Sequence, residues 1–171
     1  SYERALAIKE KVNGPDDVSF AATLMDIGIA HWRQKQFAEA RAPSERALAI
    51  FEKQLGPDHP YVAMSLDALG EVLARLGERA EARRLLERGL ALREALYGPN
   101  QSGVALSLSH LANLSRDEGR YDEARPLYER AQAIFEASYG PEHEYAVENL
   151  ADLARLERAA GPGGGQRPAG P

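Results

Sequence analysis

The side chains in this sequence best suited to chemistry are four histidines, at positions 31, 59, 110 and 143. A catalytic histidine needs a nucleophile or a carboxylate within hydrogen-bond reach, and a zinc site needs several ligands at short, fixed spacings. No motif here places a serine or a carboxylate beside a histidine, and the chain has no cysteine. The glycine-rich "GPGGG" at 161–165 follows a predicted helix instead of opening one, unlike a phosphate-binding loop. We therefore expect no catalytic residue, no metal site and no cofactor, so the chain is not an enzyme.

Two of the histidines lie in a turn that recurs along the chain. His59 follows Gly-Pro in "GPDHP" and His143 follows it in "GPEHE", and Gly-Pro also occurs at 14–15 and 98–99, so that these four Gly-Pro pairs start 42 residues apart. The phrases "YERALAI", "SERALAI", "LERGLAL" and "YERAQAI" keep the same spacing. A fixed period of about 20 to 50 residues indicates a repeat array. Residues that lie 42 positions apart are said below to share a column.

Each period predicts two amphipathic helices. In "PYVAMSLDALGEVLARLG" and "RAEARRLLERGLALREALYG", apolar residues recur at spacings of three and four, as on one face of a helix. They are Val62, Leu66, Leu69, Val72, Leu73 and Leu76 in the first helix of the pair, and Ala82, Leu85, Leu86, Leu90 and Leu96 in the second.

The residues between these runs are typical of helix ends. Gly56 and Gly77 are predicted to end helices in the left-handed conformation, and Pro60 is tolerated in a first helical turn. Asp58 and Asn100 are the predicted N-caps of the helices that follow. We therefore expect the recurring histidines to belong to turns, and not to bind metal.

Composition excludes several classes of protein. The chain has 171 residues, of which 44% are hydrophobic and 27% charged, as in a globular protein. No apolar run approaches the length of a membrane span, which is about 18 residues. The net charge of −5 opposes binding to nucleic acid or to an anionic membrane. We expect a cytoplasmic protein with a protein or peptide partner, whose identity the sequence does not reveal.

Two long phrases identify the repeat. "SLDALGEVLARLGERAEARRLLERGLALREALYGP" and "SLSHLANLSRDEGRYDEARPLYERAQAIFEASYGP" resemble the tetratricopeptide repeat of the 42-residue kind found in kinesin light chains, nephrocystin-like proteins and bacterial multidomain proteins. The resemblance covers residues 1 to about 160. Small residues stand in the columns where that family's helices approach closely: Gly28, Gly70, Ala112 and Ala154 in first helices, and Ala40, Ala82, Ala124, Ala5, Ala47, Gly89 and Ala131 in second helices.

The resemblance implies an all-α, right-handed superhelix of about eight antiparallel helices. We expect a half-repeat at 1–14 with a lone second helix at 1–12, complete repeats at 15–56, 57–98 and 99–140, and a terminal first helix at about 143–160. The sequence lacks an initiator Met, so we expect a fragment. Residues 161–171 are expected to form a flexible Gly/Pro-rich tail or linker, and the alternative is a tail that lies against a neighbouring molecule or its own array as a peptide ligand would.

The resemblance also implies a concave groove lined by the first helices, in which a protein segment binds. The predicted groove residues are Met25, Asp26, Ile29, Trp32, Arg33, Asp67, Glu71, Arg75, Ser109, His110, Asn113, Arg116 and Arg155, with Ala68, Ala151 and Asp152 beside them. Arginine suits bidentate contact with carboxylates, and a partly exposed tryptophan suits an anchor. His31 is expected to pack between helices.

Two binding modes of the family are not expected here. Members that bind chaperones hold a terminal carboxylate with lysine and asparagine, where this chain has Met25, Ile29 and Ala68. Kinesin light chains carry paired asparagines in "LNNLA", where this chain has "LMDIG", "LDALG", "LSHLA" and "LADLA". The predicted function is a non-catalytic protein-interaction module. The alternatives are a scaffold that self-associates through its ends, and a regulatory arm of a larger signalling enzyme.

Overall fold

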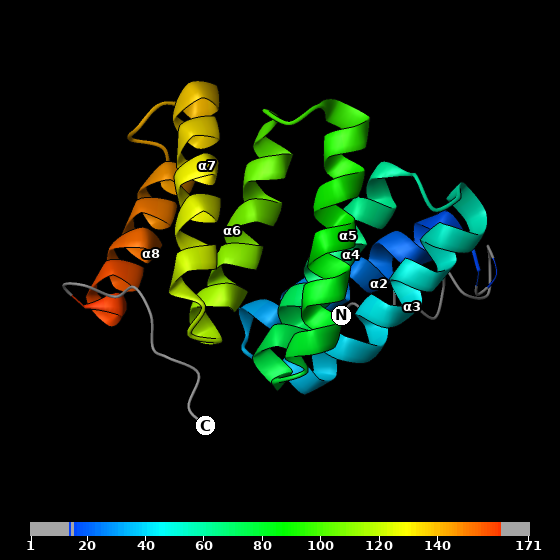
Figure 1. The fold of residues 1–171 in the computed structure, drawn as a ribbon. Coiled ribbons are helices and arrows are strands. Elements are labelled where there is room, and N and C mark those ends of the chain that lie inside the picture. The colour runs from blue at the N-terminus through cyan, green and yellow to red at the C-terminus, as the bar shows by residue number, and fades with distance from the viewer. Residues whose placement is uncertain (1–13, 15, 162–171) are drawn as a thin grey trace. The chain divides into compact units, whose positions relative to one another are not determined.

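The protein is all-helical in the part that its computed structural model describes, residue 14 and residues 16–161. The predicted helix at 1–12 and the tail after Gly161 lie outside the described residues. Seven helices and no strand are found in the described part (Figure 1): α2 (Val18–Arg33), α3 (Phe37–Leu55), α4 (Pro60–Leu76), α5 (Arg79–Tyr97), α6 (Ser102–Asp117), α7 (Tyr121–Tyr139) and α8 (Glu144–Ala160). The predicted all-α class is confirmed, and the terminal helix begins one residue later than expected.

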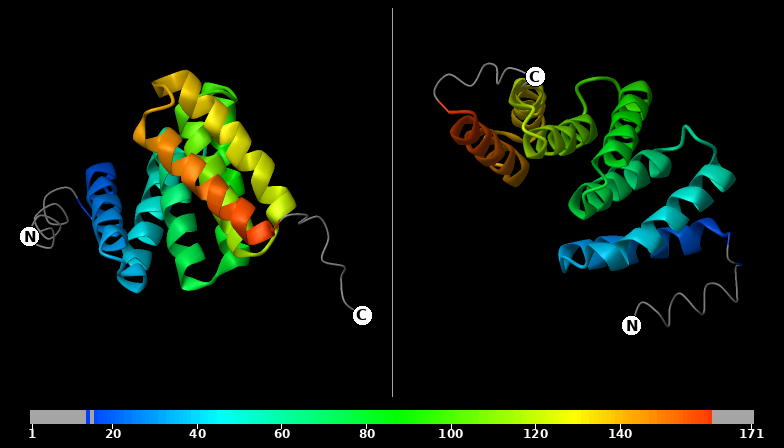
Figure 2. Two further views of the ribbon diagram at one scale, coloured as in Figure 1. Left: turned by 90° about the vertical axis from the view of Figure 1, so that its left-hand side faces the viewer. Right: turned by 60° about the horizontal axis from the view of Figure 1, so that its bottom comes forward.

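The chain forms two compact units, Ser1–Leu96 and Tyr97–Pro171. In the first unit α2 packs on α3 and α3 on α4, while α2 also contacts α4. In the second unit α6 packs on α7 and α7 on α8, while α6 also contacts α8. Consecutive helices run antiparallel within each unit (Figure 2). First helices therefore lie side by side, α2 with α4 in one unit and α6 with α8 in the other.

Small residues let the helices of a pair approach closely. A Cβ atom added to Gly28 would lie 2.4 Å from the Ser44 Oγ of α3, and one added to Gly70 would lie 2.7 Å from the Leu86 Cγ of α5. Both distances are below any normal contact, so only a residue without a side chain fits. The predicted alanines in second helices are fully buried at Ala40, Ala47, Ala82, Ala124 and Ala131. Ala112 is also fully buried, whereas Ala154 on the last helix is half-buried.

The predicted N-caps are wrong by one residue. The N-cap of α4 is His59 and not Asp58, because the helix begins at Pro60 and the His59 Nδ1 accepts a hydrogen bond from the Tyr61 backbone N–H at 3.2 Å. His143 caps α8 in the same way, 3.3 Å from the Tyr145 N–H. The N-cap of α6 is Gln101 instead of Asn100, and its side chain makes no capping hydrogen bond. The recurring histidines therefore do have a role in the turn, as caps that hold helix starts.

Of the two glycines predicted to end helices in the left-handed conformation, the prediction is confirmed for Gly77 and wrong for Gly56. Gly77 adopts φ 85° and ψ 5°, the left-handed conformation, whereas Gly56 has a similar φ but an extended ψ of 161°. The first member of the Gly77 column is Lys35, which has φ 61°. A lysine in this conformation carries a steric cost that glycine avoids.

Candidate functional site

The first-helix surface is the name used here for the side chains that α2 and α4 present in the first unit, and α6 and α8 in the second. On α2, Asp26 and Arg33 are exposed, and Met25, Ile29 and Trp32 are half-buried. The indole Nε1 of Trp32 is buried and has no hydrogen-bond partner among the described residues. The α2 side chains thus combine an apolar strip with two exposed charges of opposite sign.

On α4, the three predicted site residues have different surroundings. Arg75 is exposed and Glu71 is half-buried. Asp67 is only 4% exposed, and its Oδ2 accepts a hydrogen bond from the Arg93 Nε of α5 at 2.9 Å. A side chain would not fit at Gly89, because its Cβ would lie 2.7 Å from the Asp67 Oδ1. Asp67 therefore joins α4 to α5 as half of a buried ion pair, while Arg75 remains available to a partner.

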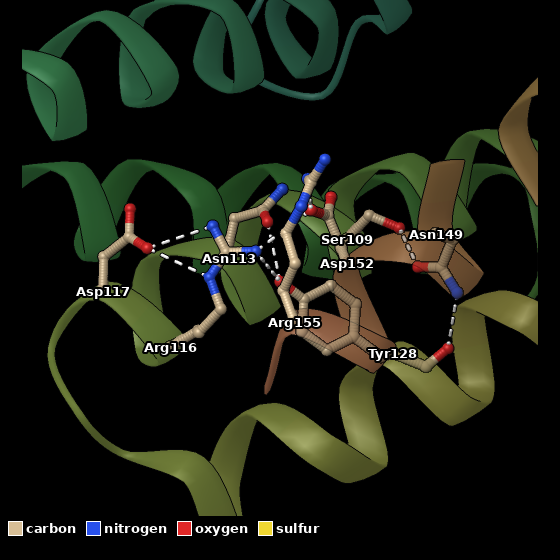
Figure 3. A network of polar contacts seen from close by, with 8 residues as sticks. All are labelled: Ser109, Asn113, Arg116, Asp117, Tyr128, Asn149, Asp152 and Arg155. Atoms are coloured by element: carbon tan, nitrogen blue, oxygen red, sulfur yellow. Dashed lines mark hydrogen bonds and ion pairs between the residues drawn. The ribbon is translucent and has the colours of Figure 1, made fainter. Parts of the chain in front are cut away.

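In the second unit, α6 and α8 are joined by a buried amide (Figure 3). The Ser109 Oγ donates to the Asn149 Oδ1 at 2.8 Å, and Asn149 is 3% exposed. The Asn149 Nδ2 donates to the Tyr128 backbone oxygen and to the Gln132 Oε1, both at 2.9 Å. One amide thus links α6, α7 and α8, which satisfies the rule that buried polar groups need partners.

Next to this amide, Tyr128 anchors a second polar cluster. The fully buried Tyr128 donates its O–H to the Asn113 Oδ1 at 2.6 Å and accepts from the Arg116 Nη1 at 3.1 Å. Burial raises the pKa of the Tyr128 phenol above its ordinary value, with Arg116 acting in the opposite direction. The phenol is therefore a hydrogen-bond donor at neutral pH. Its body packs with Ala112, Ala124 and Leu156 in the core of the unit.

Arg116 connects this cluster to the surface. Besides Tyr128, its guanidinium binds Asp117 at 3.0 Å and the Asp152 Oδ1 of α8 at 3.1 Å. Burial lowers the pKa of Arg116, but Tyr128 and the two carboxylates raise it by more, so the side chain stays charged. Its side chain is only 18% exposed. Arg116, predicted as a groove residue, shares its column with Trp32 and not with the exposed Arg33 and Arg75, and it positions Asp152.

Asp152 in turn holds Arg155 one turn later on α8. The Arg155 Nη1 donates to the same Asp152 Oδ1 that accepts from Arg116, yet the Arg155 side chain is 62% exposed. Figure 3 shows Arg116, Asp152 and Arg155 close together in one polar cluster. An arginine has five N–H donors, so most of those on Arg155 remain open to a ligand. His110 is half-buried, as is His31, whose Nδ1 lies 2.9 Å from the Gln36 Oε1.

The sequence did not reveal the residues that hold the first-helix side chains in place from positions beneath the surface or on second helices. Arg93, Gly89, Tyr128 and Asn149 were not among the predicted site residues. Their columns contained a signal: Arg93 stands where α3 and α7 have Phe51 and Phe135. A charge where the two neighbouring repeats have phenylalanine indicates a charged partner opposite, which the structure shows to be Asp67. In the described part of the chain no group of three or more histidine and acidic side chains could hold a metal ion.

The comparisons with known proteins agree with this architecture. The family model of the tetratricopeptide repeat matches residues 1–53, 19–95 and 103–161. The chain belongs to the tetratricopeptide repeat family. Such repeats are protein–protein interaction modules, and the family is a non-catalytic scaffold, so the predictions of family and of a non-enzyme are confirmed.

Solved structures place the chain near kinesin light chain-like tetratricopeptide repeat proteins. Two structures of a Podosopora anserina protein assigned as a kinesin light chain, with nearly identical TPR-like repeats, are similar to this chain, each at 26% sequence identity. The structure of its single-substitution variant has a TM-score of 0.75 and covers 92% of this chain and 74% of that chain. The other structure has a TM-score of 0.74 and covers 92% of this chain and 75% of that chain. BtubC (BKLC) from P. vanneervenii shares the fold, with a TM-score of 0.79 and 20% identity over 93% of this chain and 63% of that one. No curated protein matches the sequence.

In the part of the chain that the structure describes, no helix is both long enough and apolar enough to cross a bilayer.

Proposed function

We propose that this tetratricopeptide repeat chain binds a segment of a partner protein along its first-helix surface. The family supplies the general role in protein interaction. The predicted groove and its residues are the finer part of the proposal. Of these residues, the ones able to touch a partner are the exposed and half-exposed side chains of α2, α4, α6 and α8.

The proposal depends on the observation that the Arg155 side chain is held by an ion pair and is still exposed. Its guanidinium is oriented by Asp152, and Asp152 is itself fixed by Arg116 and faces the buried Tyr128 cluster. A long side chain normally loses rotamer freedom when it binds, at a cost of about 0.5–1.5 kcal/mol. An arginine that is already held, but is 62% exposed, loses less. Arg155 is therefore suited to contact a carboxylate or a backbone carbonyl of a bound segment.

In the first unit, Arg75 and Arg33 are the matching exposed cations, each in the last turn of its first helix. Asp26 adds an exposed negative charge on α2. The mixture of signs favours a partner segment that itself carries both charges, since like charges placed opposite one another oppose binding.

The test uses peptides selected from a random displayed library on the intact 171-residue chain. The affinity of these peptides is then measured for Arg155→Glu, Arg75→Glu and the double variant. Arg84→Glu is the control, because Arg84 also pairs with an acid three residues earlier and is 73% exposed, but lies on the second helix α5. We expect the double variant to lose at least about tenfold in affinity, or about 1.4 kcal/mol, with Arg84→Glu unchanged. Equal affinity in all variants would exclude the first-helix surface as the site.

A further inference from the structure

The first half of α8 exposes apolar side chains, whereas α4 and α6 bury the side chains of the same columns. Val147 is 51% exposed and Leu150 is 54% exposed, and Ala151 beside them is exposed too. The residues of the same two columns in α4 and α6 are 0% exposed: Ala63 and Ala105 in the Val147 column, and Leu66 and Leu108 in the Leu150 column. α8 thus has the apolar positions of a covered first helix, and among the described residues of the second unit none covers this face.

The cover of the equivalent face of α4 is the second helix α5. A Cβ added to Gly89 of α5 would lie 3.4 Å from the Leu66 Cβ and 3.6 Å from the Ala63 oxygen. A small residue at this position is what lets α5 lie so close. The α8 face formed by Val147, Leu150 and Ala151 is therefore shaped to receive a second helix whose small residue lies over Leu150.

One segment of this sequence has the required pattern. Residues 2–12, "YERALAIKEKV", repeat the second-helix sequence, as "SERALAIFEKQ" does at 44–54. Ala5 shares its column with Gly89 and with the buried Ala47 and Ala131. The segment aligns with the part of α5 that lies over Gly70 and Leu66. The second helices α3, α5 and α7 already pack against the first helices of their own pairs.

The position of a charged residue on α8 fits a covering segment as short as residues 2–12. The last turns of α8 carry the exposed Glu157 in the column of Leu73, which is 2% exposed on α4. The apolar face is thus confined to the first half of α8. The part of a second helix that lies over the second half corresponds to residues 79–85 of α5, with which residues 2–12 do not align.

We propose that the α8 face of one copy receives residues 2–12 of a second copy, so that the chain self-associates head to tail. The contact joins two different surfaces, so a further copy can add at either end and the assembly grows with concentration. This α8 face contains neither of the arginines tested above, Arg75 and Arg155, so its test does not depend on the partner proposed there.

The first experiment is sedimentation velocity of the 171-residue chain over a wide range of concentrations. We expect the wild type to associate, and Leu150→Glu and Ala5→Glu each to weaken association at least about tenfold, because a charge replaces an apolar contact. Met64→Glu is the matched control, since Met64 is 41% exposed on α4 and outside the proposed contact. A wild type that stays monomeric at every concentration overturns the proposal, as does association that Leu150→Glu leaves unchanged.

Mixing the two variants tests the head-to-tail geometry. Leu150→Glu retains an intact segment 2–12 and Ala5→Glu retains an intact α8 face, so the mixture should form dimers and nothing larger. A symmetric contact between two α8 faces would instead leave Ala5→Glu fully associated, which contradicts the assigned occupant.

A further variant, on α8, is expected to strengthen the association between copies while residues 2–12 stay unchanged. Ala151 shares its column with Asp67, and Lys9 shares its column with Arg93, the two residues that pair at 2.9 Å between α4 and α5. Ala151→Asp should therefore tighten association severalfold by creating the same pair across the contact, and Ala151→Lys should weaken it. The reverse order would show that the register is wrong, even if Ala5→Glu fails to fold.

Discussion

The two units place side chains from the same columns on their first helices, but they connect those helices differently. In the second unit, Ser109 and Asn149 form a hydrogen bond of 2.8 Å between α6 and α8. The residues of these columns in the first unit, Met25 and Ser65, lie 3.9 Å apart as a weak sulfur contact between α2 and α4. The second unit thus has the better-defined spacing between its first helices.

The two units also differ in where their ion pairs lie. The first unit buries Asp67 and Arg93 between a first and a second helix, in columns that the second unit fills with Ser109 and Phe135. The second unit has an ion pair between α6 and α8, Arg116 with Asp152, and the same carboxylate holds the exposed Arg155 of α8. A repeat can therefore exchange apolar for charged residues without changing its fold, provided that the facing column changes with it.

The largest expected effect comes from breaking the buried pair of the first unit. Asp67→Ser leaves Arg93 buried without its carboxylate, and we expect a loss of about 3 kcal/mol in the free energy of unfolding, measured with urea. Adding Arg93→Phe installs the residues that the second unit has in both columns, so the double variant should recover most of the loss. A double variant no more stable than Asp67→Ser would show that the units are not interchangeable at these columns.

A smaller loss is expected when the amide of the second unit is removed. Asn149→Ala removes the buried amide that accepts from Ser109 and donates to the Tyr128 backbone oxygen and Gln132, at a cost of about 2 kcal/mol. Ser65→Ala in the same column of the first unit removes only the sulfur contact and should cost less than about 1 kcal/mol. Similar losses in the two urea curves would remove the distinction between the units.

Alkaline pH should weaken the second unit selectively. Because the folded-state pKa of Tyr128 is raised above its unfolded value near 10, its contribution to stability is complete below pH 10 and is lost as the pH rises toward the folded-state value. Thermal melts of Tyr128→Phe should therefore depend less on pH above 10 than those of the wild type. Tyr139→Phe, at a 46% exposed site, is the control and should follow the wild type.

The smallest effect concerns a helix end in the first unit. Lys35→Gly should stabilise the protein by about 1 kcal/mol, because Lys35 holds φ 61° in the column where α4 and α6 are followed by Gly77 and Gly119. The change is read from the thermal midpoint. A lower midpoint would mean that the lysine side chain contributes more than its backbone conformation costs.

The helices and their pairing could be predicted from the sequence because each rests on local chemistry repeated every 42 residues. Apolar spacing set the buried faces, and the columns of Gly28 and Gly70 set the close approaches that the structure confirms. The caps were missed because Asp58 is the better cap by residue type, and the choice of His59 depends on where the helix axis begins.

The site was less predictable, since a column shows which face a residue occupies but not how deeply it is buried. Asp67 lies in a predicted surface column, yet the absence of a side chain at Gly89 gives it room to turn toward Arg93. Arg116 was predicted to line the groove like Arg33 and Arg75, although it lies one residue out of their register. Strict use of the 42-residue period would have placed it in the Trp32 column, behind the surface.

The central claim, that the first-helix surface binds the partner, is tested most directly by an NMR titration of the intact chain with a library-selected peptide. We predict that amide shifts concentrate on α2, α4, α6 and α8, with the Arg155 side-chain Nε–H signal among the most perturbed. Shifts that concentrate on the second helices α3, α5 and α7, and leave Arg155 unmoved, would contradict the account.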